Sequence, residues 1–319
     1  MYKIFLKNSG QSILELVIAL GVFLIIITVF TDFIYGNFVL LERGSDYVQA
    51  EAIAKEEIEA IRSIKKMTWN EFLYSTSSVS VLNNRWVLNG EGVIGNVGKF
   101  FYSSSFYPVY RNTQKDIVEE LDGEEDILTK RMKTFIEWET SDGVSAIIEK
   151  NSYISAWNSK KWLQTNWSGG PGQSIWGDAS KYESDDGNID IGIGGQLRIV
   201  EVATSTYVSS GYAISSAFNT ENNSSFVAIF WTENIPLGCD IKIQIKTAPD
   251  AGGIPGIWSA TWSGPDGEDG NETDYYTVQS GQIINVDHNN DQWIKYKVLL
   301  TSDSINTPVL SEVSFYYQQ

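Results

Sequence analysis

The sequence contains one cysteine, Cys239, and one histidine, His288, among its 319 residues. A single cysteine excludes an intrachain disulfide and any metal cluster held by several thiolates. A single histidine excludes multi-histidine metal sites and argues against Ser-His-Asp catalysis. Glycoside hydrolysis by two carboxylates needs neither residue type, so the composition leaves this chemistry open.

Basic residues are also scarce, because 23 lysines and arginines stand against 40 aspartates and glutamates, for a formal net charge of −17. Binding to a phosphate backbone requires clustered lysines and arginines, so nucleic acid is not expected as a partner. The sequence also lacks a nucleophile motif, a phosphate-binding loop and a metal triad. We therefore expect no enzymatic activity and, apart from calcium, no cofactor.

Residues 16–31 contain no charged side chain, whereas Glu15 directly precedes this apolar run. A secretory signal peptide would be followed by a small-x-small cleavage site, which the sequence lacks after the run, so the pattern favours a membrane anchor. Lys3 and Lys7 precede the run and Asp32 follows it, which places the N-terminus in the cytoplasm by the positive-inside rule. A carboxylate at the edge of lipid is costly and calls for a partner.

Proline is absent before Pro108, and residues 11–66 are predicted to form one helix of about 84 Å. Its second half carries an apolar stripe with steps of three and four residues, formed by Tyr47, Ala50, Ala54, Ile58 and Ile61. The first half is apolar all round and suits lipid or a bundle of helices. The second half suits packing on a sheet.

The stretch KNSGQSILELVIALGVFLI, residues 7–25, resembles the leader and helix start of type IV pilins and type II secretion pseudopilins. Precursors of that family have a basic leader that ends in glycine and is removed by a prepilin peptidase, and a glutamate at the fifth position of the mature chain. The resemblance implies cleavage after Gly10, a new N-terminus at Gln11 and an assembly role for Glu15. Gln11 departs from the phenylalanine that the family usually has there. Residues 50–72, AEAIAKEEIEAIRSIKKMTWNEF, resemble the second half of the helix in minor pilins.

After residue 66 the periodicity changes from helical to alternating, and residues 67–155 are predicted to form a small antiparallel sheet. Asn83 and Asn84 are a turn-prone pair between two short strands. A long helix followed by four or five short strands is an α+β unit in which the sheet covers the apolar stripe of the helix.

Residues 156–195 are rich in Ser, Gly, Asn and Asp and are predicted to be a loop or linker. Its four tryptophans either pack onto a neighbouring domain or present a stacking platform; they are Trp157, Trp162, Trp167 and Trp176. Residues 196–319 contain seven or eight alternating segments without a helix, which predicts a β-sandwich or jelly roll. Parts of this half resemble jelly-roll modules of surface proteins, some of which bind carbohydrate.

Two short motifs in the C-terminal half are candidate ligand sites. Asp186, Asn188 and Asp190 alternate in the way that calcium loops with oxygen ligands use, although a simple turn has the same composition. Trp258 and Trp262 stand four residues apart. In a strand, both would face either the core or outward as a sugar-stacking pair.

The sequence as a whole predicts a minor pilin or pseudopilin-like subunit that displays a β-sandwich outside the cell. One membrane span with a cytoplasmic N-terminus would anchor it, and its partners would be a prepilin peptidase, other pilin or pseudopilin subunits, an inner-membrane assembly platform and the lipid bilayer. Two rivals stay open, namely a membrane-anchored carbohydrate-binding or adhesive protein that recognises a surface glycan, and a glycan hydrolase. The predicted parts are 1–10 leader, 11–66 helix, 67–155 sheet, 156–195 linker and 196–319 sandwich.

Overall fold

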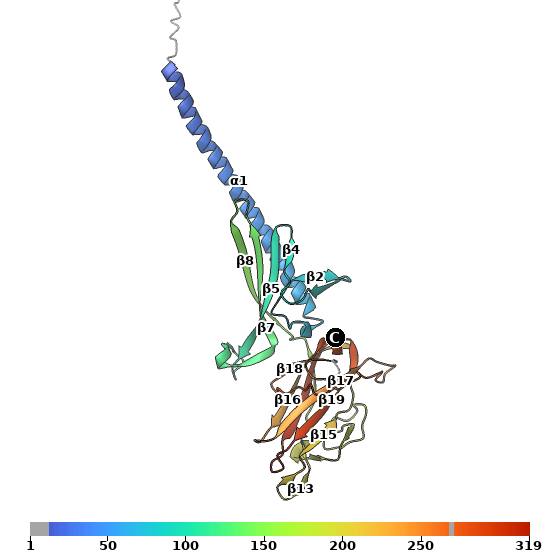
Figure 1. Ribbon diagram of the computed structural model, residues 1–319. Helices are drawn as coiled ribbons and strands as arrows, with labels where there is room; N and C mark the ends of the chain where they lie inside the picture. The colour runs from blue at the N-terminus through green and yellow to red at the C-terminus, as the bar shows by residue number, and fades with distance from the viewer. Residues whose placement is uncertain (1–12, 268–270) are drawn as a thin grey trace, which may run out of the picture.

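The computed structural model describes residues 13–267 and 271–319, and it consists of a helix-and-sheet half followed by a β-sandwich (Figure 1). This arrangement confirms the predicted α+β class. Figure 1 shows the start of the helix α1 extending away from the rest of the molecule, while its end lies against the sheet.

The helix-and-sheet half is built from one long helix, two short 3-10 helices and eight strands. They are α1 (Ile13–Ile64), η1 (Trp69–Glu71), β1 (Thr76–Ser77), β2 (Val79–Leu82), β3 (Arg85–Leu88), β4 (Gly95–Val97), β5 (Phe100–Arg111), β6 (Ile117–Val118), η2 (Glu120–Asp122), β7 (Glu124–Glu139) and β8 (Ser145–Ser155). The sheet is antiparallel with the order β1-β5-β7-β8, and β4 and β6 also pair with β5.

The second half of α1 packs on this sheet through its small and branched side chains. Of the predicted stripe, Ala50, Ala54 and Ile61 are fully buried and Ile58 is partly buried, whereas Tyr47 is 53% exposed. The fully buried members meet Ile136 and Met132 of β7, which are also fully buried. Burying one such large apolar side chain contributes about 1.5–3 kcal/mol, so this face fixes the helix to the sheet.

The strands β2 and β3 form a hairpin whose turn residues are Asn83 and Asn84. Both have positive φ angles, 50° and 61°, as the two central positions of a type I′ turn require. Asparagine tolerates this left-handed conformation better than most residues. The turn predicted at this pair is therefore present.

The sandwich half contains twelve strands and two short 3-10 helices. They are β9 (Lys160–Gln164), β10 (Ser184–Asp185), β11 (Ile189–Ile191), η3 (Ile193–Gly195), β12 (Leu197–Ile199), β13 (Glu201–Ala203), β14 (Thr206–Tyr207), β15 (Ser210–Ile214), β16 (Phe218–Asn234), β17 (Asp240–Ala248), β18 (Gln282–Ile283), η4 (Val286–His288), β19 (Asp291–Thr301) and β20 (Val309–Gln318).

Two antiparallel layers of this half are joined through the long strand β16. Its first residues pair with β19, which also pairs with β15 and β17. Its later residues pair with β20, which also pairs with β9 and β12. Fully buried side chains such as Ile243, Val298 and Phe315 form one apolar cluster with members from both layers.

The segment 156–195, which its composition predicts to be a loop or linker, instead belongs to the sandwich. Residues 160–164 form β9 and pair with β20. Trp162 and Trp167 are buried in the sandwich core, and the Trp167 indole donates a hydrogen bond to the Tyr296 hydroxyl at 3.0 Å. Of the two alternatives for the tryptophans, packing onto a neighbouring domain holds for Trp162, Trp167 and Trp176, whereas Trp157 is 80% exposed.

The two halves share a core at their junction, where η1 lies against β16. Trp69 and Phe72 are buried in one cluster with Val227 and Ala228 of β16. Asn70 between them is fully buried and forms hydrogen bonds with four residues of the sandwich, which are Ser225, Phe226, Ile284 and Asn289. Since both its amide nitrogen and its amide oxygen have partners, Asn70 fixes the orientation of the halves.

Candidate functional site

The first half of α1 presents an apolar surface on all sides. Every large apolar side chain from Ile13 to Ile34 is exposed by 42% or more. α1 is long and apolar enough to cross a membrane by length and composition, and none of its most apolar window is buried inside the protein. Such a surface needs lipid or other apolar helices to cover it.

Glu15 lies in the first turn of α1 and is exposed, next to this apolar surface. An acidic side chain in the first turn interacts favourably with the positive end of the helix dipole. Gly10 and Gln11, the residues of the predicted cleavage site, lie outside the described residues.

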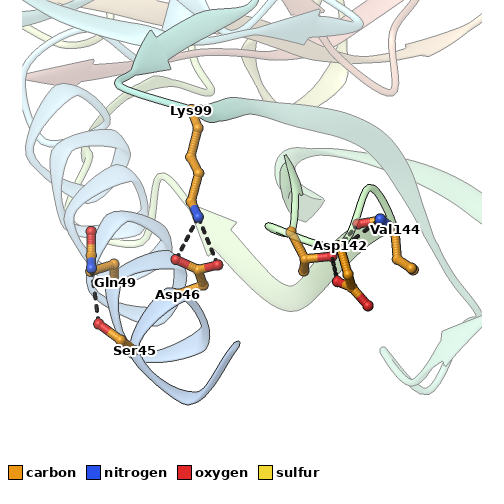
Figure 2. Close-up of polar contacts among 7 residues, drawn as sticks. Ser45, Asp46, Gln49, Lys99, Asp142 and Val144 are labelled. Atoms are coloured by element: carbon orange, nitrogen blue, oxygen red, sulfur yellow. Dashed lines mark hydrogen bonds and ion pairs between the residues drawn. The ribbon is translucent and has the colours of Figure 1, made fainter. Parts of the chain in front are cut away.

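Two ion pairs join α1 to the sheet where the helix leaves its exposed half. Asp46 is buried, and Lys99 lies 2.7 Å from each of its carboxylate oxygens (Figure 2). One turn earlier, Arg43 contacts Asp142 in the turn between β7 and β8. A buried carboxylate with one specific partner sets the register of two packed elements, so these pairs fix where the free part of the helix begins.

The pair Trp258 and Trp262 lies in the long loop between β17 and β18, so the face that a strand would have given the two rings does not apply. Both indoles are half-buried, and the ammonium of Lys295 lies 4.6 Å and 5.9 Å from their ring centroids. Trp258 also packs against a small buried cluster that includes Trp293. Lys295 forms an ion pair with Glu183 at 3.0 Å. The two rings are thus neither in the main core nor fully free.

The motif at 186–190 is used in a turn and an ion pair. Asp186 accepts a hydrogen bond from the backbone nitrogen of Asn188 at 3.0 Å. Asp190 accepts from Nε of Arg198 on the neighbouring strand at 2.8 Å. Among the described residues, no group of three or more His, Cys, Asp or Glu side chains is placed to hold a metal ion. Asp186 and Asp190 thus both form hydrogen bonds with other residues of this protein.

The only histidine, His288, is fully buried and lies between two hydroxyl groups. Its Nδ1 is 3.0 Å from Oγ1 of Thr247, and its Nε2 is 3.0 Å from Oγ of Ser263. Burial lowers the pKa of His288 to about 4, while the charge of Asp287 opposes this shift. His288 is therefore neutral at pH 7 and joins β17 to the loop that follows it.

Sequence reasoning missed the buried acidic residues of α1, Asp46 and Glu57. Both stand on the same helix face as Ala50, Ala54 and Ile61. Their spacing places them on the stripe, and this spacing was the one available signal. They were overlooked because charged residues are ordinarily assigned to the solvent face.

No family model matches the sequence, and no curated protein matches it. Similar solved structures include one described as the structural basis for the promiscuous specificity of carbohydrate-binding modules from the β-sandwich superfamily; the identity is 11%, the TM-score is 0.23, and the match covers 71% of this chain and 94% of that one. Another is the insecticidal crystal protein Cry2Aa, at 10% identity and a TM-score of 0.24, covering 76% of this chain and 36% of that one.

A third similar structure contains CBM51-2 in complex with GlcNAc and INT domains from Clostridium perfringens ZmpB. Its identity is 10% and its TM-score is 0.20, and the match covers 63% of this chain and 43% of that one. Likenesses of this size are too slight to bear on the function of this chain, which has to be inferred from its own residues.

Proposed function

We propose that this chain is a minor pilin or pseudopilin-like subunit, which acts by assembly and without catalysis of its own. The observation that carries this proposal is the division of α1. One unbroken helix of 52 residues has an exposed apolar first half and a second half that packs on an antiparallel sheet. The first half would lie in the membrane before assembly, with the N-terminus in the cytoplasm, and against the helices of other subunits afterwards.

Glu15 would select the height at which a subunit enters such a bundle. Removal of a leader ending at Gly10 would free an amine on Gln11, and that amine would pair with Glu15 of a neighbouring subunit. A subunit at the wrong height leaves the carboxylate unpaired in an apolar environment, at a cost of about 3–5 kcal/mol. The charge thereby favours one register over its alternatives.

The rigid attachment of the sandwich favours a sparse position or a tip position in the assembly. Asn70 and the shared core hold the sandwich at the end of α1. A second domain fixed in this way would crowd a filament shaft composed of identical subunits.

The proposed assembly role is tested by comparing Glu15→Ala with Glu42→Ala, which removes another exposed carboxylate from α1. Both variants should be processed and inserted into the membrane, but only Glu15→Ala should be depleted from sheared filaments, by about tenfold or more. Gly10→Val should remain an uncleaved precursor. Normal incorporation of Glu15→Ala would contradict the proposal.

A second candidate function is that of a membrane-anchored carbohydrate-binding or adhesive protein in which α1 and its sheet serve as the carrier. The observation that favours it is the half-exposed pair Trp258 and Trp262 with Lys295 over both rings. Aromatic faces stack on sugar rings, and a neighbouring lysine donates to sugar oxygens. Binding of the full chain to a surface polysaccharide, lost in Trp262→Ala, would support this candidate, and a glycan array without any binding would remove it.

A further inference from the structure

A pocket of about 310 Å³ lies between the second half of α1 and the β2–β3 hairpin. This volume is at the lower end of the range for small-molecule sites. Most of its lining is apolar or aromatic, from Ile53, Val79, Val81, Trp86, Val97 and Tyr102. Neither the assembly role nor the proposed glycan surface uses the residues that line this pocket.

The side of the pocket formed by α1 carries an unusual buried carboxyl group, that of Glu57, with only 2% of the residue exposed. One oxygen, Oε1, accepts a hydrogen bond from Oγ of Ser104 at 3.3 Å. The other oxygen, Oε2, has no hydrogen-bond partner among the described residues. A buried oxygen without a partner costs free energy, so its presence needs an explanation.

The charges around Glu57 are negative. Glu56 precedes it on α1 and is exposed at the rim of the pocket, and Tyr102 of β5 is the other titratable side chain in the lining. No lysine or arginine belongs to the described lining of the pocket. Burial raises the pKa of Glu57 to about 7, and the charge of Glu56 adds to this effect. A cation that entered the pocket would face two carboxyl groups without a competing positive charge.

The walls of the pocket suit a cation that carries an apolar chain. Trp86 and Tyr102 are half-buried, and the face of an aromatic ring attracts a positive charge. Val81 and Val97 at the rim are exposed by 57% and 54% and offer apolar surface to an incoming ligand. An inorganic cation would leave this surface uncovered, whereas an ammonium group on an alkyl chain would use both the carboxyls and the walls.

We propose that this pocket binds a primary alkylammonium group, whose nitrogen donates to the carboxylates of Glu57 and Glu56 and whose alkyl chain lies against Trp86 and Tyr102. The group is supplied either by a free amine or by a lysine side chain, which share this chemistry. When the ammonium binds, the protonated fraction of Glu57 releases its proton to solvent. Because Oε2 is buried in the unbound structure, the Glu57 side chain turns toward the pocket to accept from the ammonium.

The experiment is calorimetric titration of the full chain in detergent at pH 7 with n-butylammonium chloride, with n-butanol as the neutral control. We expect saturable binding of the amine with release of protons, seen as a heat that depends on the ionisation enthalpy of the buffer. Butanol should show no saturable binding. Glu57→Gln, which keeps the shape of the side chain, should weaken binding by about tenfold or more.

The matched control is Glu59→Gln, because Glu59 is an exposed glutamate of α1 that pairs with Arg62 outside the pocket. This variant should bind n-butylammonium as the wild type does, and Trp86→Ala should bind it more weakly. The absence of saturable binding, equal binding of butanol, or unchanged affinity in Glu57→Gln would each overturn the proposal.

A second titration distinguishes the two sources of the group. The probe is Nα-acetyl-lysine methylamide, which presents a lysine side chain with its flanking peptide bonds. Affinity about tenfold higher than that of n-butylammonium would support the pocket and assign it to a lysine of another chain. Equal or lower affinity would support the pocket as a site for a free amine.

Discussion

The two halves of the molecule differ in the carboxyl and imidazole groups that they bury. The helix-and-sheet half buries the acids Asp46 and Glu57 on α1, whereas the sandwich buries the base His288 between two hydroxyl groups. A helix on a sheet can slide along its axis, and polar contacts at given heights prevent this. The sandwich also buries polar side chains within its two layers, among them Gln164 and Gln244, which donate to backbone carbonyls.

Burial shifts Glu57 and His288 away from their charged forms, and these two groups respond to pH in opposite ways. The pKa of Glu57 is raised to about 7 and that of His288 is lowered to about 4. Glu57 therefore favours the folded first half at acidic pH, and His288 favours the folded sandwich near neutral pH.

The largest expected effect is on the folding of the isolated sandwich, and it depends on the residue at which the fragment begins. A fragment of residues 157–319 retains β9 and the buried Trp162 and Trp167, whereas a fragment of residues 196–319 loses all three. The loss of two buried tryptophans alone costs about 6–10 kcal/mol, which is comparable to the whole stability of an ordinary domain. Circular dichroism should show a β-protein with cooperative unfolding for the longer fragment and a disordered chain for the shorter one. A folded 196–319 would mean that β9 is dispensable.

The next largest effect is the loss of coupled unfolding between the two halves when their shared contact at Asn70 is removed. Asn70→Ala leaves buried carbonyls of Phe226 and Ile284 without their donor and creates a cavity, which should cost about 4 kcal/mol. We expect chemical denaturation, followed by tryptophan fluorescence, to resolve two transitions where the wild type unfolds in one. Asn112→Ala is the control, since Asn112 lies in an exposed turn. A single unshifted transition in Asn70→Ala would contradict the coupling.

The histidine gives the sandwich its own pH dependence. Above pH 6.5 the imidazole is neutral in both states and the full stability is present. As pH falls from 6.5 to about 4, the histidine is protonated in the unfolded chain but stays neutral in the folded one. The free energy of unfolding therefore falls by about 3 kcal/mol. Hydrogen exchange of β17 and β19 should accelerate across this window, and it should do so less in His288→Gln. Exchange rates without this extra pH dependence would show that His288 is charged when folded.

Glu57 should produce a similar change with the opposite sign in the other half. Below pH 4.5 the carboxyl is protonated in both states and the full stability is present. As pH rises from 4.5 to about 7, the Glu57 carboxyl ionises in the unfolded chain but stays protonated in the folded one. The free energy of unfolding therefore falls by up to about 3 kcal/mol. Glu57→Gln should remove this loss, and exchange of α1 amides near residue 57 should become independent of pH beyond the intrinsic rate. An unchanged profile in the variant would rule out this role.

The smallest effect is expected at the motif first considered for calcium. Asp190→Asn breaks a half-exposed pair with Arg198, which should cost less than about 1 kcal/mol. We expect the melting temperature of the wild type to be the same with millimolar calcium as with a chelator, since Asp190 already has a partner. A rise in melting temperature with calcium that disappears in Asp190→Asn would restore the calcium site.

Features with strong local causes were predictable from the sequence. The stripe Ala50, Ala54 and Ile61 set the buried face of α1, and Asn83 and Asn84 set a tight turn, because each depends on neighbours within a few residues. The alternating strands of the second half were recognisable for the same reason, as in Ile241, Ile243 and Ile245.

Features set by distant partners were not predictable. The assignment of β9 depends on pairing with β20, about 150 residues away, and its own composition resembles a loop. The pocket beside Glu57 exists because the β2–β3 hairpin folds back over α1. The partner of Asp190 is Arg198 on the next strand, which a motif confined to 186–190 cannot contain.

The position of β20 constrains the order of events during biosynthesis. This strand pairs with β9, β12 and β16, so the layer it organises cannot close before residue 318 has left the ribosome and crossed any membrane. The helix-and-sheet half needs nothing beyond residue 155 to complete its sheet. Long-range pairing of this kind slows folding and exposes unpaired strand edges. The sandwich would thus pass through this aggregation-prone stage while it is already attached to a completed helix-and-sheet half.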